Sequence, residues 1–107
     1  MNSLLPTWAQ SGTTILFTSW ILWVESGSLL DLVNKQTRWS IYEAYESREE
    51  CKRDMKGLIN SIKTSAIDRG EKVSDSERNA LVFEKRGVSR SAHYYCLPAD
   101  LDPRPRN

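Results

Sequence analysis

The segment from Ser47 to Gly70 constrains the fold of this chain most, because it predicts a capped helix with one apolar side that needs a partner surface. The start is a capping box, in which the Ser47 hydroxyl accepts the backbone N–H of Glu50 and the Glu50 carboxylate accepts that of Ser47. Gly70 suits the position just after a helix end. The apolar residues between them recur at spacings typical of one helical stripe: Cys51, Met55, Leu58, Ile59, Ile62 and Ala66. We predict a helix over about residues 48–69.

Short strand-like segments flank this helix on both sides. Their β-branched and aromatic content predicts strands at residues 20–25, 39–42, 80–85 and 92–97. Residues 27–37 form a long connection with an apolar patch, and residues 71–78 are predicted as a polar loop. The expected fold class is therefore α+β, a two-layer ββαββ arrangement in which a mostly antiparallel sheet carries the helix on one face.

A chain of 107 residues has room for one domain. We assign residues 11–97 to that α+β domain and residues 98–107 to a Pro-rich tail, which cannot continue a sheet. Residues 1–10 are expected to be either the remnant of a truncated signal peptide or a disordered N-terminus.

The signal-peptide interpretation depends on the stretch Leu4–Gln10, where Thr7 and Ala9 lie two positions apart, as a signal peptidase site requires. A complete signal begins with a basic region, and here the first positive charge is Lys35. The apolar run that follows, Thr13–Val24, has about 12 residues, whereas a membrane-spanning helix needs about 20. We predict a periplasmic or secreted protein without a transmembrane span.

Composition excludes several classes of function. The chain has 15 Lys and Arg against 14 Asp and Glu, and this net charge of +1 argues against a nucleic-acid partner. One His and two Cys are too few for a four-ligand zinc site of the common Cys/His kind. We predict no metal and no cofactor.

The two cysteines are predicted to pair. Cys51 lies on the apolar stripe of the helix and Cys96 on the last strand, so both side chains reach the same layer if the helix packs on the sheet. A bridge across the roughly 45 residues between them stabilises by roughly 4 kcal/mol in the chain-entropy model. The alternative is a pair of buried, reduced thiols in a cytosolic protein.

Three short motifs resemble those of a family of uncharacterised, short, exported bacterial proteins. The first is W-x-L-W at Trp20–Trp23, the second is Ala44–Ser47 followed by Cys51 at the start of the helix, and the third is C-L-P-x-x-x-D-P-R at Cys96–Arg104. Ala99 departs from the pattern, because the similar proteins usually carry Asp there. The resemblance implies an exported location and a paired Cys51 and Cys96, and it implies no activity.

Candidate catalytic groups are few. His93 is the only imidazole of the chain, and Asp100 and Asp102 form an acidic pair on the tail. Together they would be the acid–base groups of a small enzyme. The simpler interpretation is a surface histidine, with Asp102 fixing a turn before Pro103.

A possible interaction face follows from strand alternation. If Trp20, Leu22 and Val24 face the helix, successive residues point the other way. Ile21 and Trp23 then lie on the opposite face of the sheet. Tyr95 joins them there, since Cys96 must face the helix. An uncovered apolar face of this kind would bind a partner or a second copy. Alternatively, the connection Gly27–Gln36 folds over it.

The function expected from these features is that of a small, exported, disulfide-stapled domain, a non-catalytic binding or accessory protein of the cell envelope. One alternative is a small envelope enzyme that uses His93 and the tail acids. The other is a cytosolic interaction protein with reduced thiols.

Overall fold

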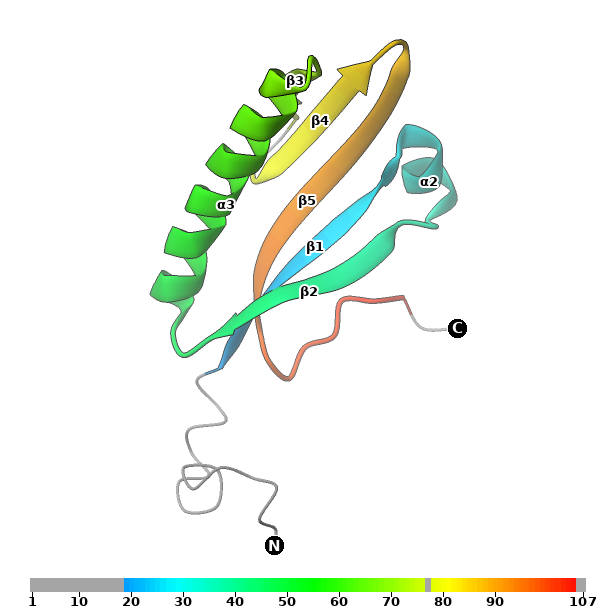
Figure 1. Ribbon diagram of the computed structural model, residues 1–107. Helices are drawn as coiled ribbons and strands as arrows, with labels where there is room; N and C mark the ends of the chain where they lie inside the picture. Colours follow the sequence, from blue (N-terminus) through cyan, green and yellow to red (C-terminus); the bar gives the residue numbers. More distant parts are fainter. Residues whose placement is uncertain (1–18, 77, 106–107) are drawn as a thin grey trace, which may run out of the picture.

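The computed structural model describes residues 19–76 and 78–105, so the predictions for residues 1–10 lie outside the described residues. Within this part of the chain, two helices and five strands follow one another, and Figure 1 shows their arrangement. In order they are β1 (Trp20–Ser28), α2 (Leu29–Asn34), β2 (Arg38–Tyr45), α3 (Arg48–Asp68), β3 (Lys72–Asp75), β4 (Ala80–Lys85) and β5 (Val88–Pro98).

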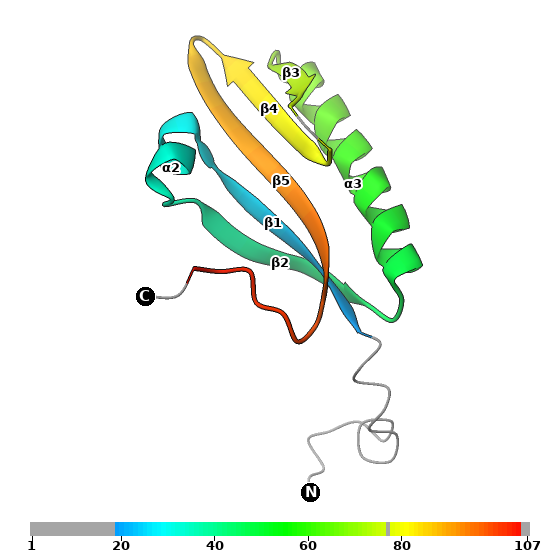
Figure 2. The same ribbon diagram turned by 180° about the vertical axis from the view of Figure 1, so that it is seen from behind.

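The strands form one sheet in the order β2-β1-β5-β4-β3, and every neighbouring pair is antiparallel. Helix α3 lies across one face of this sheet, and the two opposite views agree on this arrangement (Figures 1 and 2). The predicted α+β fold, a sheet with one long helix on one face, is confirmed. Neither α2 nor α3, the helices of the described residues, is long and apolar enough to cross a membrane.

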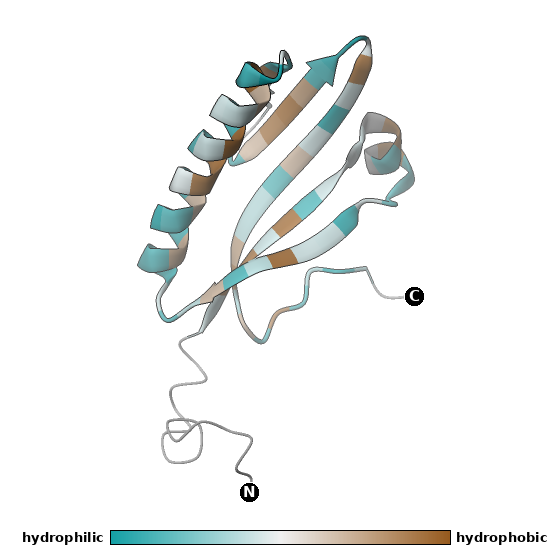
Figure 3. Ribbon diagram, viewed as in Figure 1, coloured by the Kyte–Doolittle hydropathy of each residue, from teal (hydrophilic) through white to brown (hydrophobic). Residues whose placement is uncertain are grey.

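Helix α3 agrees with its prediction almost to the residue. The Ser47 hydroxyl accepts the backbone N–H of Glu50 at 3.1 Å, which is one half of the expected capping box. Cys51, Met55 and Ala66 of the apolar stripe are buried, and Figure 3 shows the apolar side of α3 turned toward the sheet.

The core between α3 and the sheet consists of alternate residues of the central strands. Leu22 of β1, Phe83 of β4 and Tyr94 of β5 are at most 3% exposed. Trp20 and Val24 pack against the same cluster. The predicted alternation of β1 is therefore confirmed.

The predicted polar loop over residues 71–78 is wrong for Lys72–Asp75, which form β3 and pair with β4. This strand occupies a sheet edge, and only its Val73 is even half-buried, so it lacks the alternating apolar pattern that marks a strand. Strand β1 continues to Ser28, beyond its predicted end at residue 25, because β5 pairs with it as far as Arg90.

Strand β5 starts four residues earlier than predicted, at Val88, because residues Arg86 and Gly87 alone make the turn from β4. Both have positive φ, 54° and 79°, which is the type I′ geometry of two-residue hairpins. Glycine adopts this conformation freely, whereas arginine is strained in it.

Relieving that strain is expected to stabilise the protein. Arg86→Asn should raise the free energy of unfolding by about 0.5–1 kcal/mol, because Asn tolerates the left-handed region better than Arg. Arg86→Val should lower it, since a β-branched residue fits that region worst. Urea denaturation of both variants checks the prediction, and a loss of stability in the Asn variant would contradict it.

The disulfide between Cys51 and Cys96 joins the first turns of α3 to β5, with the two Cα atoms 6.1 Å apart and 45 positions between them in sequence. Cys51 is fully buried. Because β5 is the middle strand of the sheet, the bridge connects the helix to the centre of the fold.

Breaking this bridge should lower the free energy of unfolding by roughly 4 kcal/mol, as expected for a closed loop of this length. The measurement is urea denaturation with and without reductant. A Cys51→Ala/Cys96→Ala variant is the matched control, because reductant should leave it unchanged. Equal midpoints for oxidised and reduced wild-type protein would refute the expectation.

Candidate functional site

The sheet face turned away from α3 carries a cluster of rings, which we call the aromatic face: Trp23, Trp39, His93 and Tyr95. Trp23 lies directly across from Tyr95 in the β1–β5 ladder. The Trp23 and Trp39 rings meet edge to face with centroids 6.3 Å apart, and the Trp39 and Tyr95 centroids are 5.4 Å apart. The His93 ring stacks on that of Tyr95 at 6.3 Å. The sheet thus has a second packed layer of side chains.

Glu25 holds one side of the aromatic face in place. Its carboxylate accepts the Tyr95 hydroxyl at 3.1 Å and the Thr37 hydroxyl at 2.7 Å. Hydrogen bonds to a charged acceptor are stronger than neutral ones. Glu25 therefore fixes the tyrosine ring and the start of β2 to the end of β1.

Helix α2 covers the Gly27 end of the same face. A Cβ atom on Gly27 would lie 3.0 Å from that of Asp31, so only glycine lets the helix approach the strand this closely. Ser28 and Asp31 exchange two side-chain hydrogen bonds with each other's backbone N–H, both 3.0 Å long, and these cap the short helix.

The C-terminal tail covers the Trp23 end. It runs past β2 on the side of the sheet away from α3 (Figures 1 and 2). The guanidinium of Arg104 lies 5.4 Å from the centre of the Trp23 ring, within cation–π distance. Asp102 accepts hydrogen bonds from the backbone N–H of Arg104 at 3.0 Å and from its side chain at 2.6 and 2.9 Å. These hydrogen bonds to Asp102 raise the pKa of the Arg104 guanidinium above its ordinary value.

The residues of the predicted interaction face lie on the expected side of the sheet, but the surface is not open at its centre. Trp23 is 4% exposed, and Ile21 and Tyr95 are half-buried. Large apolar side chains that are exposed lie elsewhere, on β2 and the tail (Ile41, Tyr42 and Leu101), on α2 (Leu30 and Val33), at the end of α3 (Ile67) and at the start of β5 (Val88). Trp39 was not assigned to this face from sequence, although its position opposite Glu25 in the β1–β2 ladder places it there.

The candidate catalytic groups have structural partners. His93 stacks on Tyr95, and Asp102 fixes the turn of the tail by binding Arg104. Asp100 is exposed. Within residues 19–76 and 78–105, no group of three His, Cys, Asp or Glu side chains lies close enough to hold a metal ion.

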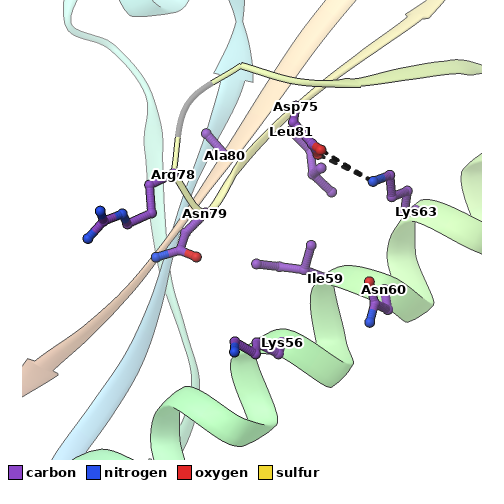
Figure 4. A pocket seen from close by; sticks show the side chains of 9 residues that line it. All are labelled: Lys56, Ile59, Asn60, Lys63, Asp75, Arg78, Asn79, Ala80 and Leu81. Carbon is purple, nitrogen blue, oxygen red and sulfur yellow. Dashed lines mark hydrogen bonds and ion pairs between the residues drawn. The ribbon is translucent and has the colours of Figure 1, made fainter.

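A second surface, which sequence analysis did not single out, lies beside α3. Two adjoining hollows of about 470 and 560 Å³ share Lys56, Arg78 and Asn79 and form one groove between α3 and the turn that leads into β4. Figure 4 shows the side chains that line the first of them. We call it the cationic groove, after the basic side chains that line it: Lys52, Arg53, Lys56, Lys63 and Arg78. The sequence shows these lysines on the helix surface, but the hollow exists only because a distant turn faces them.

No known protein family matches the chain, and no curated protein or solved structure is significantly similar to it. The functional argument therefore depends on the disulfide and on the geometry of these two surfaces.

Removing the Arg104 side chain is expected to uncover Trp23. Arg104→Ala should increase quenching of tryptophan fluorescence by acrylamide and slightly lower the free energy of unfolding, since the cation–π contact is partly exposed. Arg78→Ala is the matched control on the opposite side of the sheet and should leave the quenching unchanged.

The effect must also depend on the ring itself. In a Trp23→Phe background, Arg104→Ala should no longer alter the quenching of the remaining tryptophans. If the same increase persists there, Arg104 does not act by covering Trp23.

Proposed function

We propose that this protein is a non-catalytic binding or accessory protein of an oxidising compartment, either the periplasm or the outside of the cell. The observation that carries the proposal is the disulfide between Cys51 and Cys96 in the middle of the fold. Disulfides persist in such compartments and are rare where glutathione and thioredoxin keep thiols reduced.

The stability that the bridge contributes is a second argument for an exported protein. A domain of this size buries limited apolar surface, so a cross-link worth roughly 4 kcal/mol is a large share of its stability. The three short motifs between Trp20 and Arg104 resemble those of short exported bacterial proteins, and that resemblance implies the same location.

Binding is favoured over catalysis by what the polar side chains do. Glu25 accepts two hydroxyl donors, and Asp102 is occupied by Arg104, so both acids support the fold. An enzyme based on His93 and the tail acids would need these groups directed at a shared substrate site. In contrast, the cationic groove presents charge in a concave surface, which is typical of recognition.

Trapping thiols in intact native cells tests the proposal. An alkylating reagent that shifts the mass of free thiols is added before lysis, and the full-length protein is then recovered from each cell fraction. We expect both cysteines to resist alkylation until reductant is added, and the protein to be found outside the cytoplasm.

The same samples would also show the result that contradicts the proposal. Two freely alkylated thiols in a cytoplasmic pool would overturn the proposal and support a cytosolic interaction protein with reduced cysteines. Recombinant protein alkylated after full reduction provides the reference mass for that state.

A further inference from the structure

The cationic groove concentrates positive charge that the chain as a whole does not have. Of the residues that the structure describes, five basic side chains line it against two acids, Glu49 and Asp75, which sum to a charge of +3 in a protein of net charge +1. Lys63 lies 3.4 Å from Asp75. Among the described residues, no carboxylate is within 4.0 Å of Lys56 or Arg78. These two cations are therefore available to a ligand.

Basic side chains predominate on the flank of α3 that borders the groove, with Glu49 beside them. At 3.6 residues per turn, Lys52, Lys56 and Lys63 fall on the flank of the helix that borders the groove. Glu50 and Asp54 fall on the opposite flank. Lys52 and Lys56 are four positions apart, a spacing at which like charges repel and weaken a helix. Glu49, three positions before Lys52, offsets part of this repulsion, and an anionic ligand would offset more of it.

The floor of the groove is apolar. Met55 and Leu81 are 4% and 1% exposed, and Ile59 is half-buried. Figure 4 shows Ile59 and Leu81. Lys52 and Lys63 are separated by about 16 Å along the helix axis. An extended peptide of about five residues has that length. The groove therefore suits a short extended peptide that carries acidic side chains along its edges and one apolar side chain facing the floor.

We propose that the cationic groove binds an extended acidic segment of a partner protein, with an apolar side chain of that segment resting on Met55 and Ile59. Its carboxylates would pair with Lys56 on the helix and with Arg78 on the facing turn. This inference rests on the proposed binding function and names the chemical class of its partner.

A flat anionic membrane fits these observations less well than a peptide. A surface broad enough to lie on α3 would also meet the acidic flank, where Glu50 and Asp54 would repel it. A narrow chain in the groove meets mainly the cationic flank, where the basic side chains outnumber Glu49 and Asp75. The concave shape likewise suits a chain better than a plane.

Fluorescence anisotropy with a labelled peptide, Leu-Asp-Glu-Leu-Asp-Glu-Leu, tests the inference on the oxidised full-length protein. We expect saturable binding with a Kd below about 100 μM at low salt. Raising NaCl from about 0.05 M to about 0.5 M should weaken it about tenfold, because exposed charges are screened. Peptides with the acids changed to amides, or with the leucines changed to serines, should each bind at least about tenfold more weakly.

Charge-reversal variants of the protein test whether the peptide binds in the cationic groove. Lys56→Glu and Arg78→Glu should each raise the Kd about tenfold. Arg38→Glu makes the same charge change on β2, away from the groove, and should leave the Kd within about twofold. All three side chains are exposed, and thermal unfolding confirms that each variant is folded.

Three results would overturn the inference: no saturable binding at about 1 mM protein, equal binding by the groove variants and wild type, or stronger Lys56-dependent binding to phosphatidylglycerol vesicles than to the peptide. None of these three results contradicts the proposed function if the thiols are oxidised in native cells. Reduced thiols there would overturn the proposed function, whatever the peptide does.

Discussion

The bridge between Cys51 and Cys96 is the constraint on which the rest of the structure depends. It ties the start of α3 to the middle strand of the sheet and so decides which residues of that strand face the helix. Tyr94 shares the helix side with Cys96, while His93 and Tyr95 point the other way. Because β1 pairs with β5 in fixed register, the same choice places Leu22 in the core and Trp23 on the aromatic face. One covalent bond thereby orients both layers.

The features of the fold that are encoded locally could be predicted from sequence. The ends of α3 follow from the Ser47 cap and the periodic stripe, and the side of β1 that faces the helix follows from simple alternation. Strand β3 could not be predicted, because an edge strand with one half-buried residue, Val73, has no burial pattern to reveal it. The early start of β5 was missed because Arg86 adopts a turn conformation that favours glycine or asparagine.

In the candidate sites too, features that depend on one strand could be predicted, and features that depend on distant segments could not. Ile21, Trp23 and Tyr95 could be assigned to one face from alternation alone, but the covering of Trp23 depends on Arg104, more than eighty positions away. The groove depends on still more distant partners, since Lys56 belongs to α3 and Arg78 to the turn before β4. Sequence indicates which side chains are exposed and charged. It does not show which separate segments face each other across a hollow.

The structure also holds the groove open at both ends of α3. The disulfide fixes the start of the helix, and near its end the Lys85 ammonium donates to the Arg69 carbonyl at 2.7 Å. Glu71 accepts from both Arg69 and Arg90 at 3.0 Å, which joins the helix end to β5. With the helix held at both ends, its middle faces the turn before β4 across a preformed space. A ligand entering such a groove loses less free energy to ordering the protein, so the cross-link that stabilises the fold also prepares the surface for binding.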